Sequence, residues 1–409
     1  MILEKEKFQK EHPGIYEVWE YLEQLKVDAV LVGGAVRDLL LGASPTDFDL
    51  ASSLTPEELL EIAKKKNWQA NAVGSAFGVL VLTVQNESLE IATFRKEGYG
   101  SDPHRPAWVE YGASLEEDLS RRDFTINGMA LTWNGELIDP FGGKKDLENK
   151  LIRTIGEPLL RFTEDPLRLL RAIRFAAKLG FVIEDQTLNE IGKSAYQIER
   201  LAQERITQEM ELILLLPRAS QGLDLLGISG VGRYIFGEHW PGRNQWTGLL
   251  ARLLAIKVLR WAVVAWGLGK QAIRMKGLDL VTQKQAIWIA EKSEEEWQGT
   301  ETLSQWSASF ADKKEFEKML EYFWQFREAL GDKAVASKRA EARKLLDQLP
   351  FFRSDLSIRG DEITSIVGQG PQVAKVSAYL LKGVQQNQIK NDEKSLEEAV
   401  NFWWKEKRV

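Results

Sequence analysis

Apolar residues recur at helical spacing between residues 14 and 25, and then gather in short strand-like runs up to residue 138. Between two of these runs, residues 56–66 have helical periodicity, with Thr55 as a suitable N-cap and Pro56 at the first helical position. The first 150 residues are therefore predicted to form a mixed α/β domain with one sheet. The predicted strands are Ala29–Val32, Asp47–Leu50, Val79–Val84, Leu89–Phe94, Ala130–Thr132 and Leu137–Ile138.

Beyond Leu151 the strand patterns stop and helical patterns continue to the end of the chain. Helices are predicted over Pro166–Leu179, Asp185–Lys193 and Gln203–Leu215. Most of the 14 tryptophans follow residue 230 on such patterns, which favours packing between helices over stacking on RNA bases. The predicted fold class is α+β, with one mixed β-sheet at the N-terminus and an all-α remainder.

Composition narrows the class of protein. The chain has 409 residues, 44% of them hydrophobic, which is enough for two to four domains with cores of their own. It contains no cysteine and begins with a charged stretch, and its longest apolar run is interrupted by Lys257 and Arg260. We therefore expect a cytoplasmic protein that does not associate with a membrane. The net charge of −6 argues against indiscriminate nucleic-acid binding, although a local basic groove is compatible with it.

A glycine pair, an arginine and two carboxylates lie within seventeen residues, at Gly33, Gly34, Arg37, Asp47 and Asp49. Residues two apart on a strand point to the same side, so the two aspartates are expected to aim at one point while Phe48 turns into the core. Two carboxylates that close are unfavourable unless a cation lies between them, and hard oxygen ligands suit Mg²⁺. The segment is predicted to hold a triphosphate and its metal ions.

This segment resembles the signature of the tRNA nucleotidyltransferase/poly(A) polymerase family, class II, which includes tRNA CCA-adding enzymes and bacterial poly(A) polymerases. The resemblance implies a DNA polymerase β-like nucleotidyltransferase head at residues 1–150. A helical neck (151–216), body (217–310) and tail (311–409) would follow, with tRNA bound by the tail. None of the three histidines forms a His-Asp pair, so the phosphohydrolase (HD) domain of some relatives is not expected.

A two-metal site needs a third carboxylate, and Glu90 is the best candidate, on a predicted strand and on the face opposite Leu89 and Ile91. The alternative is an ordinary solvent-facing glutamate. The next residues, 96–108, are rich in glycine, proline and charge, as is typical of a mobile loop. In the resembled family this loop is linked to the switch from adding C to adding A. Asp102 and Arg105 are its candidates for nucleotide or primer contact.

The segment from Arg121 to Asn127 resembles the family's second motif. There the arginine matching Arg122 contacts the triphosphate and the aspartate matching Asp123 contacts the ribose. The segment from Asp139 to Gly143, with Asp146, matches a third motif and is expected to be a structural turn between head and neck.

The predicted helix after Pro166 carries charge along one face, at Asp165, Arg168, Arg171 and Arg174. Its apolar residues Leu167, Leu170, Ile173 and Phe175 are expected to fall on the other side and pack. In the resembled family the matching aspartate and first arginine are a protein template for the incoming base. Cytosine and adenine each place an amino group beside an unprotonated ring nitrogen, which a carboxylate and a guanidinium complement, whereas uracil and guanine present the opposite pattern. Arg171 and Arg174 would reach phosphates. The alternative is that Asp165 caps the helix and the arginines form surface ion pairs.

Taken with these residues, the resemblance implies an enzyme that adds C, C and A to tRNA 3′ ends from CTP and ATP without a nucleic-acid template. Alternatives within the family are CC addition alone, A addition alone or poly(A) synthesis, and a different class is an inactive tRNA-binding module. Relatives are often dimers, which by analogy favours a homodimer. A basic cluster at Lys338, Arg339, Arg343 and Lys344 is a candidate for tRNA phosphates, with a solvated helix face as the equal alternative.

Overall fold

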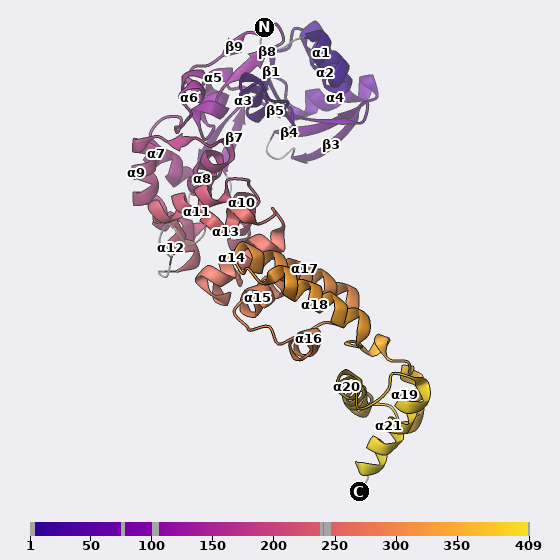
Figure 1. The fold of residues 1–409 in the computed structure, drawn as a ribbon. Helices are drawn as coiled ribbons and strands as arrows, with labels where there is room; N and C mark the ends of the chain where they lie inside the picture. Colours follow the sequence, from indigo (N-terminus) through magenta and orange to yellow (C-terminus); the bar gives the residue numbers. More distant parts are fainter. Residues whose placement is uncertain (1–4, 75–77, 100–105, 238–239, 241–246, 408–409) are drawn as a thin grey trace. The chain divides into compact units, whose positions relative to one another are not determined.

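A computed structural model describes the chain except residues 1–4, 75–77, 100–105, 238–239, 241–246 and 408–409 (Figure 1). Contacts within the chain divide it into two compact units. One unit comprises Met1–Thr247 and Gln271–Asp279, and the other comprises Gly248–Lys270 and Leu280–Val409. The division into head, neck, body and tail is finer than these units and stays a prediction.

The first unit contains a mixed seven-stranded sheet, which together with the many helices confirms the α+β fold class. β2 and β5 are parallel and the other neighbouring strands are antiparallel. The prediction that Asp47 lies on a strand is wrong: β2 begins at Asp49, opposite Val32, because β1 ends there and offers Asp47 no partner. The strand order is β3 (Gln69–Gly74), β4 (Val79–Val84), β5 (Glu87–Thr93), β2 (Asp49–Ser52), β1 (Ala29–Val32), β8 (Ala130–Thr132) and β9 (Leu137–Ile138).

Alternate residues of the central strands serve two cores, one on each face of the sheet. Leu31 of β1 belongs to the larger core, with Trp19 and Leu22 of the N-terminal helices. Val30 and Val32 belong to the smaller core on the other face. This is the two-residue period that the sequence pattern predicts. The helices packed in the larger core are α1 (Lys5–Glu11), α2 (Pro13–Gln24), α3 (Gly34–Leu40) and α4 (Pro56–Lys66).

The structure confirms the predicted bounds and cap of α4. The Thr55 side chain accepts a hydrogen bond from the backbone N–H of Glu58, and the Glu58 carboxylate accepts one from the N–H of Thr55. This capping box satisfies two N–H groups that the first turn leaves unpaired. Asn67, in the left-handed conformation at φ 55°, ends the helix.

Residues 96–108, predicted to be a loop, instead include much of a β-ribbon formed by β6 (Arg95–Tyr99) and β7 (Pro106–Tyr111). Gly98 lies opposite Trp108, and a Cβ at Gly98 would stand 2.2 Å from the indole ring. The glycine that made this segment look like a loop is therefore what lets the ring lie across the ribbon. Asp102 and Arg105 lie outside the described residues.

The helical part of the first unit is built around α8 (Leu167–Leu179), which contacts α10 (Gln203–Leu214) and α11 (Ala219–Ile228). The prediction that strands stop at Leu151 is wrong. One short parallel pair of strands follows, formed by β10 (Leu151–Ile152) and β11 (Val182–Ile183). The other helices of this unit include α5 (Leu115–Ser120), α6 (Gly143–Glu148), α7 (Pro158–Glu164), α9 (Asp185–Ser194) and α12 (Val231–Phe236).

Tryptophans form much of the core of the second unit, as predicted. Trp306 and Trp324 are buried, and the rings of Trp288 and Trp306 meet edge to face with centroids 5.5 Å apart. A separate cluster forms between α19, α20 and α21. The helices after α12 are α13 (Thr247–Arg252), α14 (Lys257–Leu268), α15 (Leu280–Lys292), α16 (Thr300–Ser307), α17 (Lys313–Ala329), α18 (Val335–Gln348), α19 (Gly360–Val367), α20 (Pro371–Gln385) and α21 (Glu393–Glu406).

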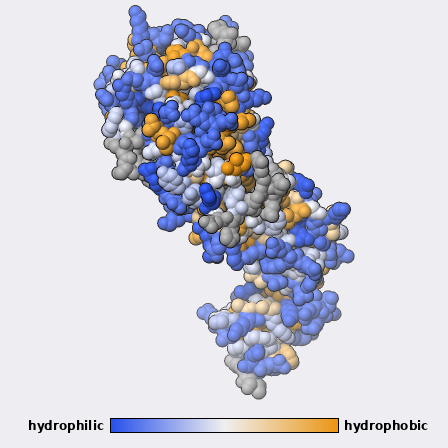
Figure 2. Space-filling model, turned by 90° about the vertical axis from the view of Figure 1, so that its left-hand side faces the viewer, coloured by the Kyte–Doolittle hydropathy of each residue, from blue (hydrophilic) through white to orange (hydrophobic). Residues whose placement is uncertain are grey.

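Across the part of the chain that the structure describes, no helix is both long and apolar enough to span a bilayer. On the face shown in Figure 2, hydrophobic residues lie in small patches separated by hydrophilic ones.

Asp332, between α17 and α18, makes a local pH-dependent contribution to stability. Burial acts to raise the pKa of this carboxyl, but hydrogen bonds from Arg327, the backbone N–H of Ala334 and Lys338 lower the pKa to about 2. A carboxylate whose pKa falls on folding stabilises the fold above its unfolded pKa, and that stability is lost as the pH falls through the folded pKa.

We expect Asp332→Asn to lower the free energy of unfolding by about 1 kcal/mol at neutral pH, because solvent near the surface screens these ion pairs and reduces their contribution. The difference from wild type should shrink between about pH 4 and pH 2, because over this range the wild-type carboxyl is protonated first in the unfolded state and then in the folded state. Urea unfolding of the full chain, carried out across this pH range, measures the difference in unfolding free energy between the two proteins. A difference that stays constant over the whole range would contradict the assignment.

Candidate functional site

A cavity of about 590 Å³ in the first unit gathers eleven of the twelve predicted site residues. Those eleven are Gly33, Gly34, Arg37, Asp47, Asp49, Arg122, Asp123, Asp165, Arg168, Arg171 and Arg174. Glu90 is not among its lining residues. The remaining lining residues were not predicted, and they are Glu97, Arg121, Asn127, Leu167, Phe175 and Arg205. The structure thus brings the predicted residues together, while their individual roles stay predictions.

The glycine pair forms the turn from β1 into α3. Gly33 has a φ of 70°, a conformation that favours glycine, and a Cβ there would stand 3.2 Å from Nη1 of Arg122 and 3.9 Å from Oδ2 of Asp49. One turn into α3, the buried Arg37 donates from Nη1 to Oδ1 of Asn127 at 2.8 Å and from Nε to Asp38. The absence of a side chain at Gly33 therefore leaves a small space between an arginine and a carboxylate.

The two aspartates lie at the start of β2, with Phe48 buried between them in the larger core, as predicted. Burial raises the pKa of Asp49, and the nearby carboxylates of Glu90 and Asp47 raise it further, against the opposing effect of Arg122. The parallel pairing of β2 with β5 explains the influence of Glu90, because it places Glu90 directly opposite Asp49. Negative charge at this point is incompletely compensated by the protein.

This donor set suits a divalent cation, because a positive ion would relieve the repulsion that raises the pKa of Asp49. Within the described residues, however, no three His, Asp or Glu side chains already converge closely enough to hold a metal ion. Glu90 is exposed on β5 beside Asp49. Its place as a third ligand stays a prediction.

Arg121 and Arg122 share a carboxylate that sequence reasoning missed. Asp118, on α5, is fully buried and accepts from Nη2 of Arg121 at 2.8 Å and from Nη2 of Arg122 at 3.2 Å. Glu97 of β6 accepts from Nη1 of Arg121 at 2.8 Å, which ties the ribbon to the cavity. Burial would raise the pKa of Asp118, but the two guanidinium groups overcome this and lower it.

Asp123, predicted to contact a ribose, is buried and forms an ion pair with Arg171. Its Oδ2 accepts from Nη2 of Arg171 at 2.6 Å and from Nε at 2.8 Å, and its Oδ1 accepts from Asn127. Burial opposes ionisation, yet Arg171 and the other hydrogen bonds lower the pKa of Asp123. The carboxylate is therefore held ionised and fixed in direction at the wall of the cavity.

The charged face of α8 was interpreted either as a site for the base and phosphates or as a helix cap with ion pairs, and the structure has features of both. Asp165 caps the helix, since its Oδ1 accepts from the N–H of Leu167 at 3.1 Å, and its Oδ2 lies 3.5 Å from Nη2 of Arg205. Arg168 donates to Glu164 at 2.6 Å, and Arg174 donates to Glu209 at 2.6 Å. Arg168, Arg171 and Arg174 of α8 nonetheless line the cavity together with Asp165. Capping and ion pairing hold these side chains where they face the cavity.

Phe175 was predicted to pack on the far side of the helix, and this is wrong. It lines the cavity, and the guanidinium carbons of Arg37, Arg171 and Arg174 lie 5.4, 5.4 and 4.6 Å from its ring centroid. The reason is helical geometry, because residues 171 and 175 are four apart and share a face. The ring holds three cations at one wall.

The third motif is a structural turn, as predicted. The carboxylate of Asp139 accepts from the N–H groups of Gly143 and Lys144 at the start of α6, at 2.7 and 2.9 Å. Asp146 accepts from the hydroxyl of Thr125 and from Arg153. None of these residues lines the cavity.

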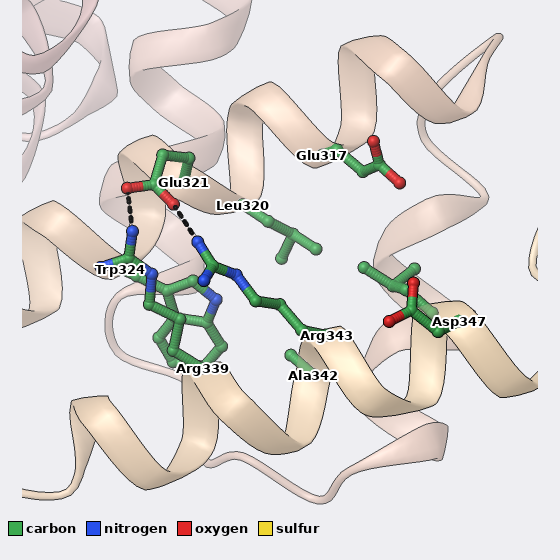
Figure 3. A pocket seen from close by; sticks show the side chains of 9 residues that line it. Glu317, Leu320, Glu321, Trp324, Arg339, Ala342, Arg343 and Asp347 are labelled. Atoms are coloured by element: carbon green, nitrogen blue, oxygen red, sulfur yellow. Dashed lines mark hydrogen bonds and ion pairs between the residues drawn. The ribbon is translucent and has the colours of Figure 1, made fainter.

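The candidate basic cluster in the second unit is largely neutralised by acids. Figure 3 shows Arg339 and Arg343 of α18 turned toward Glu321 of α17, beside a cavity of about 320 Å³. Lys338 pairs with Asp332 at 3.1 Å. This favours the alternative of a solvated, ion-paired helix face over a phosphate site.

Residues 29–153 match a family model described as the poly(A) polymerase head domain. Residues 180–242 match one described as "Probable RNA and SrmB- binding site of polymerase A". The chain is 33% identical to the CCA-adding enzyme of Geobacillus thermodenitrificans over 93% of each protein. It is 40% identical to that of Geobacillus stearothermophilus over 269 residues, 64% of this chain and 65% of that one.

Solved structures agree with these matches. The CCA-adding enzyme of Bacillus stearothermophilus in complex with CTP has a TM-score of 0.79 and 29% identity, over 96% of this chain and 98% of that one. The Thermotoga maritima CCA-adding enzyme complexed with tRNA has a TM-score of 0.62 and 21% identity over 95% of each chain, which shows a shared fold.

Proposed function

This chain belongs to the CCA-adding enzyme family, and from that premise we propose that it is a nucleotidyltransferase that adds C, C and A to tRNA 3′ ends from CTP and ATP. The observation that carries the proposal is the single cavity into which Gly33, the aspartates of the β2 segment and the charged face of α8 all open. A triphosphate and a base can be held there at once. The tRNA 3′-hydroxyl would lose its proton to water, and its oxygen would bond to the α-phosphorus as the bond from that phosphorus to the bridging oxygen breaks and pyrophosphate leaves.

The arginines of the cavity suit the triphosphate. Arg37, Arg122, Arg171 and Arg174 place four guanidinium groups on its walls, and a guanidinium donates two parallel hydrogen bonds to a phosphate. The space beside Gly33 lets the phosphate chain approach the backbone. Asp123 would accept from a ribose hydroxyl with the oxygen lone pairs that Arg171 leaves free, which would favour ribonucleotides.

Enzymes of this family use divalent metal ions, and we propose Mg²⁺ held by Asp47 and Asp49, with Glu90 as the third carboxylate. When bound, the ion would lower the pKa of the tRNA 3′-hydroxyl and neutralise charge on the departing pyrophosphate. The protein's own contribution is to keep Asp47 and Asp49 beside the space at Gly33, with Phe48 anchoring the segment in the core.

Base selection is assigned to Asp165 and Arg168. Asp165 would accept from the amino group of cytosine or adenine, and Arg168 would donate to the adjacent ring nitrogen. The hydrogen bond from the N–H of Leu167 and the ion pair with Glu164 fix the directions of the two side chains. Rigid placement is what makes a mismatched base costly, because it leaves buried groups unpaired.

The proposed tRNA partner is supported by the RNA-binding family match over residues 180–242. A homodimer, a cytoplasmic location and tRNA binding by residues 311–409 stay predictions. The remaining alternatives are CC addition, A addition, poly(A) synthesis and an inactive tRNA-binding module.

Stepwise extension of tRNA separates these alternatives. The protein is incubated with Mg²⁺ and tRNA that ends at the discriminator base, with CTP, ATP or both, and products are resolved by one nucleotide. We expect two additions with CTP alone and three with both nucleotides. Two additions both with CTP alone and with the two nucleotides together would indicate CC addition, and a long ladder of products would indicate poly(A) synthesis. No extension of this tRNA or of tRNA ending in CC would indicate an inactive module. Extension by A only on tRNA ending in CC would indicate A addition.

A further inference from the structure

Asp118 is a buried carboxylate directly behind the cavity, and no role in the reaction has been assigned to it above. Its side chain is 0% exposed. Each of its oxygens serves a different arginine, with Oδ1 accepting from Arg121 at 2.8 Å and Oδ2 accepting from Arg122 at 3.2 Å. The backbone N–H of Arg95 also donates to Oδ1, at 3.4 Å. A carboxylate with three donors and no solvent is rigid.

The two arginines differ in how they are held. Arg121 also has Glu97 of the ribbon as a partner, at 2.8 Å. Within the described residues, the hydrogen bonds of the Arg122 side chain go to Asp118, and its Nε is buried with no acceptor. Asp118 therefore sets the direction of Arg122 in particular.

That direction matters for the nucleotide. Nη1 of Arg122 lies 3.2 Å from the position a Cβ would take at Gly33, so the guanidinium borders the space assigned to the triphosphate. The same Cβ position lies 3.9 Å from Oδ2 of Asp49, so the guanidinium and this carboxylate border one small space. Arg122 thus stands between two possible partners, a phosphate and a carboxylate that the metal ion needs.

Resting on the proposed function, we propose that Asp118 is a positioning residue that aims Arg122 at the triphosphate and keeps it from pairing with Asp49. Without the charge at Asp118, Arg122 would be free to turn toward Asp49, whose Oδ2 borders the same space. Phosphate contact and metal binding would then weaken together.

Asp118→Asn tests this with two binding measurements that do not depend on turnover. Calorimetric titration of CTP in the absence of divalent ions should show binding on the order of tenfold weaker than in wild type. Titration of Mn²⁺ in the absence of nucleotide should also show weaker binding. The matched control is Glu117→Gln, the neighbouring residue on α5, where glutamine retains the capping box with Ser114. The dissociation constants of this control for CTP and for Mn²⁺ should lie within twofold of the wild-type values.

A double-mutant cycle with Arg122→Lys shows whether Asp118 acts through Arg122. We expect Asp118→Asn to weaken CTP binding by less than about twofold once Arg122 is already lysine. Independent, additive effects would overturn the proposal, as would unchanged CTP and Mn²⁺ binding in a folded Asp118→Asn protein. If that variant does not fold, Asp118→Glu retains the charge but displaces Arg122, and must weaken CTP binding for the proposal to stand. Wild-type tRNA extension, measured alongside, reports separately on the proposed function.

Discussion

Asp49→Asn is expected to slow nucleotide addition on the order of 10³-fold or more while tRNA binding persists. Asparagine has the same shape but no charge, so it binds a divalent ion much more weakly than the aspartate, whose negative charge the neighbouring carboxylates reinforce. Binding of tRNA depends on phosphate contacts made elsewhere and should be little affected. The rate of the first addition from CTP and a gel-shift titration with tRNA measure the two effects.

Stability distinguishes this loss of activity from misfolding. The pKa of Asp49 is raised in the fold, so the ionised carboxylate disfavours the folded state at neutral pH, and a neutral residue removes that penalty. The variant should therefore unfold at the same temperature as wild type or a higher one. The control is Asp28→Asn, an exposed aspartate before β1 in the same unit, which should add CTP within twofold of the wild-type rate. Near-normal addition by Asp49→Asn would remove the metal assignment.

Asp165→Asn is expected to reduce the preference for CTP over UTP by about 1–3 kcal/mol, which is roughly a factor of 5 to 150. Asparagine retains an oxygen that can accept from the N–H of Leu167, so α8 keeps its cap. Its amide N–H₂ group, however, is a donor where the amino group of cytosine needs an acceptor. The variant therefore changes the base-recognising edge without removing the helix start.

Addition of each of the four nucleotides under single-turnover conditions measures the change in selectivity. Asp185→Asn is the matched control, an exposed aspartate in the first turn of α9, and should leave the CTP-to-UTP ratio at its wild-type value. A wild-type ratio in Asp165→Asn, together with normal CTP addition, would place base selection elsewhere in the cavity.

Much of the head could be predicted because its strands are short apolar runs separated by helical patterns and turn residues. β1, β4, β8 and β9 have the predicted bounds, and so does α4, whose capping box can be read from Thr55 and Glu58. The β6–β7 ribbon was missed because Gly98 and the surrounding charges are typical of loops. In the fold that glycine accommodates the ring of Trp108. The side chain of Glu97 is largely buried, and its charge is balanced by ion pairs with Arg95 and Arg121.

The same distinction holds at the site. The acidic pair, the glycine pair and the charged face of α8 each occupy a short stretch, so their chemistry could be predicted from local spacing. Some partners of the cavity's charged residues lie far away in the chain. Glu97 of β6 pairs with Arg121 and Arg205 of α10 pairs with Asp165, and no local pattern in the sequence relates Glu97 or Arg205 to the cavity. Asp118 differs, because it lies four residues before Arg122, a helical spacing at which charged side chains pair.

The order of amino acids was sufficient to define which groups this protein offers to a nucleotide, because strand and helix periods set which neighbouring side chains face the same way. Folding decided which distant charges meet those groups, and hence which arginines are tethered, which carboxylates stay ionised and which aromatic ring faces the cavity. The physical reason is that ion pairing and burial depend on distances between segments far apart along the chain, and packing of the sheet and helices sets those distances.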